Sequence, residues 1–160
     1  MPYPLPFRPM TTPERALVLE IAVENAGPGE LRLKKIGIGA RPYRKHFVQL
    51  GGMGVRDLLW DGDDLLLLAG PTMDITGLQS VFRLRCAVCL DDDSLTGIDD
   101  PGLELLFQLP VVDGGDKAEG LARYDGLGEP GLLVVFDAPR PERLVGSDGV
   151  LADVYPLPAV

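Results

Sequence analysis

Short runs of hydrophobic residues alternate with turn-forming residues along the whole chain. The runs are rich in Leu, Val, Phe and Tyr, and Gly, Pro or Asp separates each run from the next. Most are shorter than the roughly ten uninterrupted residues that a stable helix needs, so they predict β-strands. The expected strands are Ala16–Glu24, Glu30–Ile36, His46–Leu50, Val55–Trp60, Leu65–Ala69, Val81–Val88, Glu104–Leu109, Glu119–Tyr124, Leu132–Asp137 and Val150–Leu157.

The runs differ in how many of their faces are hydrophobic. Residues 18–24 alternate between hydrophobic and polar positions, which is typical of a strand with one face in solvent. Residues 65–68 are four consecutive leucines, which indicates a strand that is covered on both faces. We therefore expect sheets that stack on one another, with the strand at 65–68 in the interior.

An internal repeat is the strongest signal in the sequence. Residues 55–62 (VRDLLWDG) align with residues 119–126 (EGLARYDG), and each copy ends in an aromatic residue followed by Asp-Gly. Asp-Gly between two hydrophobic runs predicts a hairpin turn, because Gly tolerates a positive φ and Asp forms local hydrogen bonds. A hydrophobic strand follows each copy, at 65–68 and at 132–135.

Two flanking strands extend the repeat on either side. Val18–Ile21 matches Val81–Leu84, and Phe47–Leu50 matches Leu106–Leu109. Four strands that recur about every 60 residues are typical of a β-propeller with long loops. Many short strands are also a feature of β-sandwiches and barrels. We predict an all-β fold of antiparallel four-stranded repeats, as a partial β-propeller, with a β-sandwich or irregular barrel as the alternative.

The repeat divides a single domain, residues 1–160, into three units. Residues 51–109 make a complete unit, whereas residues 9–50 and 110–157 each make a partial one. Incomplete units leave strand edges and apolar faces without partners inside the chain. We therefore expect copies of the chain to associate through these units.

Charge and hydropathy narrow the choice of partners. The chain holds 15 Lys and Arg against 24 Asp and Glu, a net charge of -9, which repels nucleic-acid phosphates and anionic lipids. Its hydrophobic runs are far shorter than the roughly 20 residues of a membrane helix. The first residues show neither the charged nor the hydrophobic region of a signal peptide. We expect no nucleic-acid or membrane partner and a cytoplasmic location.

Several stretches resemble one known family. Residues 50–58 (LGGMGVRDL) and 61–74 (DGDDLLLLAGPTMD) are similar to the signature of an uncharacterised bacterial family, domain of unknown function 3616. Residues 118–121 and 150–154 resemble later parts of the same family, so the resemblance covers most of residues 9–155. It implies a propeller-like fold in which this chain corresponds to the C-terminal half. The family has no established activity, so the resemblance implies no catalytic residue.

Clusters of acidic residues raise the possibility of a divalent metal. Calcium requires several converging oxygen ligands, and propeller hydrolases of the lactonase or phosphoesterase class use such centres. The spacing here matches no calcium-binding loop, so solvated turns are the favoured interpretation and Ca²⁺ the alternative. We accordingly expect no cofactor. The clusters lie at residues 61–64, 91–93, 99–100 and 113–116.

The remaining candidates for chemistry give no catalytic arrangement. Cys86 and Cys89 are three positions apart, which on a strand places their sulfurs on opposite faces, so we expect two separate thiols. His46 is the only histidine, and serines such as Ser94 lack the Gly-x-Ser-x-Gly context of a nucleophile. We therefore expect a ligand-binding or protein-binding β-repeat module, with the hydrolase as the alternative function.

Four residues are the candidate binding groups. Arg56, Asp57 and Glu119 lie at nearly equivalent places on the strands that open two repeat units, where a propeller has its central channel. Mutual pairing of these charges is the alternative interpretation. His46 belongs to the one basic stretch of the chain, residues 41–46, which would suit a phosphate or carboxylate; a solvated entrance to the strand is the favoured interpretation.

Overall fold

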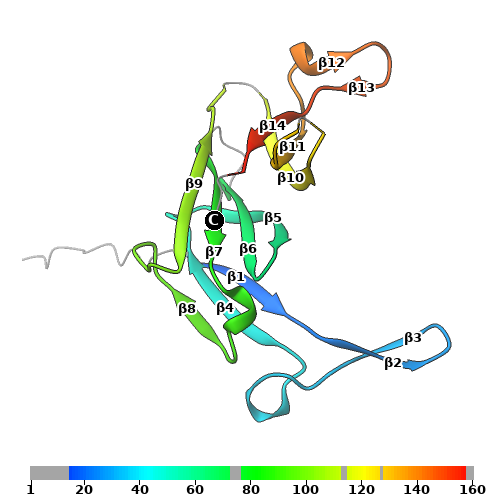
Figure 1. The fold of residues 1–160 in the computed structure, drawn as a ribbon, viewed down its shortest axis with the longest axis vertical. Coiled ribbons are helices and arrows are strands. Elements are labelled where there is room, and N and C mark those ends of the chain that lie inside the picture. The colour runs from blue at the N-terminus through cyan, green and yellow to red at the C-terminus, as the bar shows by residue number, and fades with distance from the viewer. Residues whose placement is uncertain (1–14, 73–76, 113–114, 127, 158–160) are drawn as a thin grey trace, which may run out of the picture.

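The structure is a computed structural model that describes residues 15–72, 77–112, 115–126 and 128–157. Within these ranges the regular elements are β-strands and three short 3-10 turns (Figure 1). The strands are β1 (Arg15–Glu20), β2 (Val23–Gly27), β3 (Glu30–Leu33), β4 (Arg44–Gln49), β5 (Gly54–Asp61), β6 (Asp64–Gly70), β7 (Gln79–Leu84), β8 (Ser94–Thr96), β9 (Leu103–Leu109), β10 (Lys117–Tyr124), β11 (Gly131–Asp137), β12 (Leu144–Val145), β13 (Gly149–Val150) and β14 (Asp153–Pro156). The turns are η1 (Ile38–Ala40), η2 (Ala87–Cys89) and η3 (Pro141–Arg143).

Three sheets form the body of the molecule. The first sheet has the order β1-β4-β8, the middle sheet β5-β6-β7-β9, and the third sheet β10-β11-β14. Neighbouring strands are antiparallel except for β8, which runs parallel to β4. Two hairpins, β2–β3 and β12–β13, project away from the sheets (Figure 1). The all-β prediction is confirmed, and within the described ranges no sheet closes into a barrel.

The middle sheet is buried on both faces. On β6, Leu65, Leu67 and Ala69 pack in one hydrophobic cluster with Val48 of the first sheet. The intervening residues of β6 pack in a second cluster with Leu132 of the third sheet. Alternate side chains of a strand point to opposite faces, so a strand of consecutive leucines supplies both clusters. The prediction that this strand lies between two sheets is confirmed.

The two Asp-Gly turns of the repeat alignment adopt different structures. Asp61 and Asp64 pair across a tight turn that joins β5 to β6, and Gly62 there has a φ of 65°, which Gly adopts without strain. In the third sheet β10 ends at Tyr124 and β11 begins only at Gly131, so this connection is longer. Both copies therefore join antiparallel neighbours, as predicted, but the tight turn forms only in the first copy.

The strand boundaries also differ from the expected ones in places. The run 16–24 forms two strands, β1 and β2, instead of one. The expected strand 81–88 ends at Leu84, because Cys86 takes a left-handed conformation and the turn η2 follows. The short strand β8 was not expected in the polar segment 91–102. Residues 9–14, part of the first predicted repeat unit, lie outside the described residues.

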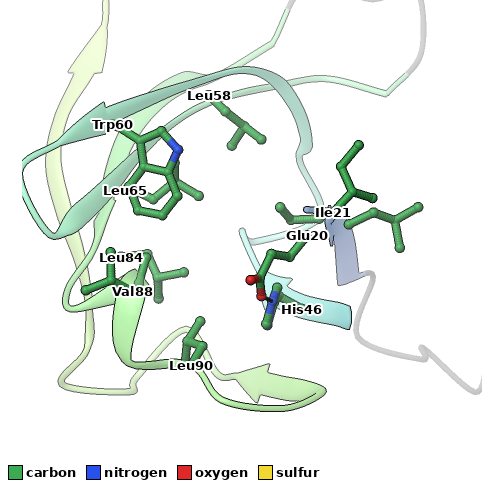
Figure 2. A pocket seen from close by; sticks show the side chains of 12 residues that line it. Glu20, Ile21, His46, Leu58, Trp60, Leu65, Leu84, Val88 and Leu90 are labelled. Atoms are coloured by element: carbon green, nitrogen blue, oxygen red, sulfur yellow. Dashed lines mark hydrogen bonds and ion pairs between the residues drawn. The ribbon is translucent and has the colours of Figure 1, made fainter. Parts of the chain in front are cut away.

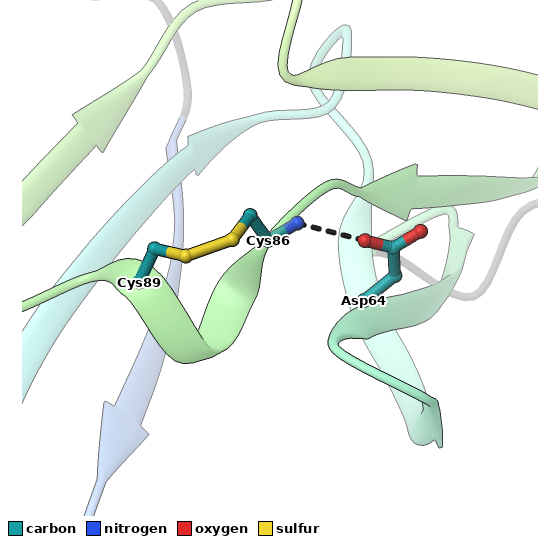
Figure 3. The surroundings of a disulfide bond; sticks show 3 residues. All are labelled: Asp64, Cys86 and Cys89. Atoms are coloured by element: carbon teal, nitrogen blue, oxygen red, sulfur yellow. Dashed lines mark hydrogen bonds between the residues drawn. A yellow bond between two sulfur atoms is a disulfide. The ribbon is translucent and has the colours of Figure 1, made fainter.

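The prediction of two separate thiols is wrong. Cys86 and Cys89 form a disulfide across η2, with their Cα atoms 5.3 Å apart (Figure 3). A spacing of three residues separates side chains on an extended strand but brings them to one side of a 3-10 turn. The backbone N–H of Cys86 also donates a hydrogen bond to Oδ1 of Asp64, at 2.7 Å, which ties the turn to the start of β6.

Candidate functional site

A cavity of about 460 Å³ lies between β1 and the middle sheet. One wall carries Leu58 and Trp60 from β5, and another carries Val88 and Leu90 from the disulfide-closed turn η2 and the residue after it. Figure 2 shows Trp60 across the cavity from Glu20, whose carboxylate lies beside the His46 ring. The volume of the cavity falls in the range of about 300–1,000 Å³ that is usual for small-molecule sites.

The polar end of the cavity is a short hydrogen-bonded row. His46 Nε2 lies 3.1 Å from Oε2 of Glu20, and its Nδ1 lies 2.8 Å from the hydroxyl oxygen of Ser94. The guanidinium of Arg44 donates to both oxygens of Glu20, at 3.2 and 3.3 Å. His46 is only 6% exposed, and hydrogen-bond partners on both sides of its ring fix the orientation of the ring.

Strand register brings these groups together. In the first sheet Val18 lies opposite His46 and Glu20 lies opposite Arg44, so all four share the face that looks toward the middle sheet. The parallel strand β8 places Ser94 opposite His46 on the other side of β4. Residues separated by 26 and 48 positions therefore become neighbours.

The row is suited to binding more than to nucleophilic attack. A carboxylate only accepts hydrogen bonds, so Nε2 of His46 carries the proton that is shared with Glu20. In the neutral ring Nδ1 then accepts from the Ser94 hydroxyl. Glu20 and His46 line the cavity, but Ser94 is not among the lining residues. The serine therefore lies on the far side of the ring from the space that a ligand would occupy.

The other three predicted binding residues lie at the seam between β5 and β10. Nη1 of Arg56 forms an ion pair with Glu119, at 3.0 Å, and its Nη2 donates to the carbonyl oxygen of Pro71. Oδ2 of Asp57 accepts the backbone N–H of Leu121, at 2.7 Å. These charges pair with each other and with backbone groups and join the middle sheet to the third. The contacts of His46 are with Glu20 and Ser94 and not with these three residues, whose role in ligand binding stays a prediction.

The basic stretch 41–46 is engaged by acidic residues of the same chain. Nη2 of Arg41 pairs with Asp93 at 2.8 Å, and the backbone N–H of Lys45 donates to the other oxygen of Asp93. These two hydrogen bonds lower the pKa of Asp93 from its ordinary value of 3.8. Arg44 is occupied by Glu20. The stretch therefore anchors the segment before β8 to the first sheet.

Several residues of the acidic clusters likewise take part in ion pairs and turns. Asp61, only 6% exposed at its side chain, binds Arg83 at 3.1 Å and also Arg123. Asp100 accepts the backbone N–H of Gly102. Within the described ranges no three His, Cys, Asp or Glu side chains group so as to hold a metal ion. Asp113, in the last predicted cluster, lies outside the described residues.

A second ionic cluster fastens β14 to the rest of the third sheet. The guanidinium of Arg143 donates a hydrogen bond to each carboxylate oxygen of Asp153, both at 2.7 Å. It also stacks on the ring of Phe136 and lies 2.8 Å from Asp116. Burial raises the pKa of Asp116, but the backbone N–H of Arg140 and the guanidinium groups of Arg143 and Arg140 outweigh it, so the net shift is downward. The hydrogen bonds from Arg143 lower the pKa of Asp153.

Two residues that line the cavity, Glu20 and Trp60, and the His46 partner Ser94 were not among the predicted site residues. Glu20 stood in an alternating strand, Ser94 in a polar segment, and Trp60 in a repeat motif. The one available signal was Trp60, the only tryptophan of the chain, in a run whose neighbouring strand is fully hydrophobic. It is more than half exposed in the structure, which is uncommon for so large an apolar side chain.

The protein is all-β, and its sheets are stacked. Its candidate site is the cavity between the first sheet and the middle sheet. The model of one family, described as proteins of unknown function (DUF3616), matches residues 10–153. The chain belongs to this family. No curated protein and no solved structure matches the chain. No helix in the described ranges is long and apolar enough to cross a membrane.

Proposed function

We propose that this protein is a binding module whose cavity takes a compact, mostly apolar molecule that carries one hydroxyl or amine group. The observation that carries the proposal is the contrast within the cavity: its walls are apolar, and the Glu20–His46 pair stands at one end. Ligand sites are commonly built in this way, with apolar walls for affinity and a few polar groups for orientation.

The polar end determines the head group. Arg44 and His46 both donate to Glu20, and a carboxylate offers about four acceptor positions, so Glu20 keeps capacity for one further donor. A hydroxyl or an ammonium group supplies that donor. A ligand carboxylate would instead face the charge of Glu20 without a proton to share. Like-charge contacts in a partly apolar site are unfavourable, so carboxylates are disfavoured.

The hydrolase alternative receives no support from the geometry. One residue in each of three predicted acidic clusters, Asp61, Asp93 and Asp116, is held by an arginine. A carboxylate that is held by a guanidinium is stabilised where it is and is not poised to ligate a cation.

The test uses Trp60 as an internal reporter, since it is the only tryptophan and lines the cavity. Hexylamine, hexanol and hexanoate share one chain and differ in the head group. We expect hexylamine and hexanol to shift the Trp60 emission to shorter wavelength in a saturable way, and hexanoate to bind at least tenfold more weakly.

Two variants separate the proposed site from general hydrophobic binding. Glu20→Gln removes the charge at the polar end and should abolish the preference for amine over carboxylate. Glu104→Gln makes the same chemical change in the exposed Arg85–Glu104 pair and should leave the preference intact. Binding that ignores the head group, or no saturable shift with any of the three compounds, would overturn the proposal.

A further inference from the structure

The disulfide between Cys86 and Cys89 is accessible from solvent. Both cysteines are exposed, and the bond between them closes a short turn. A thiolate can attack a disulfide only where it can reach one of the two sulfurs, so this disulfide is open to exchange. Exposed disulfides are more often labile or regulatory than buried ones.

The backbone of this turn, η2, depends on the disulfide for its conformation. Cys86 is left-handed, with a φ of 49°, which is unfavourable for a residue with a Cβ atom. The N–H groups of Cys89 and Leu90 donate hydrogen bonds of the 3-10 type, whose geometry is poorer than that in an α-helix. Two further hydrogen bonds join η2 to the turn between β5 and β6. We expect η2 to loosen when the disulfide is broken.

The segment that the disulfide closes forms part of the cavity wall. Ala87 and Val88 lie between the two cysteines and Leu90 directly follows them, and all three line the cavity. Figure 2 shows Val88 and Leu90 at the wall that this segment supplies. Ala87 and Leu90 also pack against the hydrophobic cluster between the first sheet and the middle sheet. A change in η2 therefore changes the apolar wall.

The same segment contacts the polar end of the cavity. The carbonyl oxygen of Leu90 accepts a hydrogen bond from Nη1 of Arg44, at 3.4 Å. The same nitrogen donates to both carboxylate oxygens of Glu20, the group that orients the head group in the proposed function. Movement of Leu90 therefore changes the surroundings of the Glu20 carboxylate as well as the wall.

We propose that the Cys86–Cys89 disulfide is a reversible redox switch for the cavity, which a dithiol reduces and which in its reduced form binds ligand more weakly. This inference rests on the proposed binding function. One thiolate of the dithiol attacks an exposed cysteine sulfur and forms a mixed disulfide, and the other cysteine leaves as a thiolate. The second thiolate of the dithiol then attacks the mixed disulfide and becomes part of the oxidised dithiol. The two cysteine thiolates take up the protons that the dithiol has lost.

The position of the disulfide allows this cycle without unfolding. Both cysteines lie in the connection between β7 and β8, so their bond joins no two strands and the sheets should stay folded after reduction. The Cα atoms are 5.3 Å apart with two residues between the cysteines, so the thiols stay close to each other in the reduced chain. Closing so short a loop again costs little conformational entropy.

The experiment measures hexylamine binding, through the emission of Trp60, in the oxidised, the reduced and the reoxidised chain. Dithiothreitol reduces the chain without denaturant, and oxidised glutathione reoxidises it after the reductant is removed. Alkylation and mass spectrometry count the free thiols in each state. The double variant Cys86→Ser/Cys89→Ser, treated in the same way, shows any effect of the reagents themselves. Hydrogen exchange compares residues 86–90 with β6 in the absence of ligand.

We expect dithiothreitol to release two thiols in the folded chain and to weaken hexylamine binding about tenfold or more, and reoxidation to restore the binding. The double variant should bind as weakly as the reduced chain, with or without the reagents. Exchange should become faster in residues 86–90 on reduction and stay slow in β6.

Three results would overturn the inference alone. They are a disulfide that dithiothreitol does not reduce in the folded chain, binding that is equally strong after reduction, and a loss of protection in β6, which would make the disulfide a structural bond of the whole fold. If the oxidised chain itself showed no saturable binding, the proposed function would fail, and the redox control with it.

Discussion

Arg83 is the most deeply buried charge of the described residues, and removing its partner should destabilise the fold strongly. Its side chain is 1% exposed and lies on the side of β7 that faces the third sheet. Asp61 is 3.1 Å from its Nη2, and Asp64 is 3.6 Å from its Nε. Breaking a buried ion pair from one side costs about 3–5 kcal/mol, because the remaining charge is left without compensation in a poorly hydrated place.

The structure places Asp61→Asn at the lower end of that range. Asparagine keeps an oxygen that accepts from Arg83, and Asp64 remains nearby. The variant also loses the contact of Asp61 with the more exposed Arg123, which adds at most about 1 kcal/mol. We therefore expect a loss of roughly 3–4 kcal/mol in the free energy of unfolding. At about 2–4 °C per kcal/mol for a chain of this size, Tm should fall by about 6–16 °C.

The assay is urea denaturation followed by far-ultraviolet circular dichroism, for Asp61→Asn, Arg83→Met and the double variant. Arg83→Met should cost less than Asp61→Asn, because Asp61 still has Arg123 as a partner. The double variant should be more stable than the sum of the two losses predicts, since neither charge is then left alone. Glu104→Gln, in an exposed pair, should change stability by no more than about 1 kcal/mol.

Two results would refute this reasoning. If Asp61→Asn lost less than about 1 kcal/mol, the pair would be hydrated in solution and not buried. If the two single losses added without coupling, Arg83 and Asp61 would not stabilise each other.

Three further perturbations test other parts of the fold. The pKa of Asp116 in the folded state lies below 3.8, so its contribution to stability is complete above pH 3.8 and is lost as the pH falls through the lowered pKa. The fall in Tm on acidification should therefore be shallower in Asp116→Asn. Cys86→Ser opens a four-residue loop, which the chain-entropy model values at about 2 kcal/mol, and mass spectrometry after alkylation should find no free thiol in the unreduced chain. Asp57→Ala leaves the Leu121 N–H without its partner and should cost about 1–3 kcal/mol in urea denaturation, whereas Asp137→Ala, an exposed contact, should change little.

The disulfide also bears on where the protein works. Disulfides persist in oxidising compartments and are rare in the cytosol. The sequence, in contrast, predicts a cytoplasmic location. The turn that the disulfide closes supplies Val88 to the cavity wall. Hexylamine binding measured with and without reductant therefore tests whether the cavity requires the oxidised form.

Most of the fold could be predicted from hydrophobic patterning, because period and run length report burial directly. The leucine run of β6 predicts burial on two faces, and this is what Leu66 and Leu67 show. The disulfide could not be predicted in the same way, since it depends on the left-handed conformation of Cys86 and not on residue type. Arg83 was missed because a cation inside an apolar run does not reveal that carboxylates from a neighbouring turn will reach it.

The candidate site was harder to predict because it depends on register. Glu20, His46 and Ser94 come from three strands, and a shift of one residue in any of them would turn a side chain to the opposite face. No pattern along the sequence fixes such a register. His46 was found as a residue type with chemistry, but its partners were not.

A bulge in β5 links the two candidate regions to each other. Val55 pairs with Ala69 and Asp57 with Leu68, so Arg56 is an extra residue between them. Because of it, Asp57 faces the third sheet while Leu58 and Trp60 face the cavity. Without the bulge, every later side chain of β5 would point to the opposite face.

The third sheet has the same device at the matching place. Glu119 is the extra residue between Ala118 and Gly120 on β10, and it is the partner of Arg56. The two bulged residues thus meet at the seam, at positions that the sequence alignment places one residue apart. Their charges were singled out as a binding site, but their geometry assigns them first to the seam. The bulge at Arg56 both frees that residue to reach Glu119 and orients Trp60 toward the cavity, so the seam and the cavity depend on one irregularity in β5.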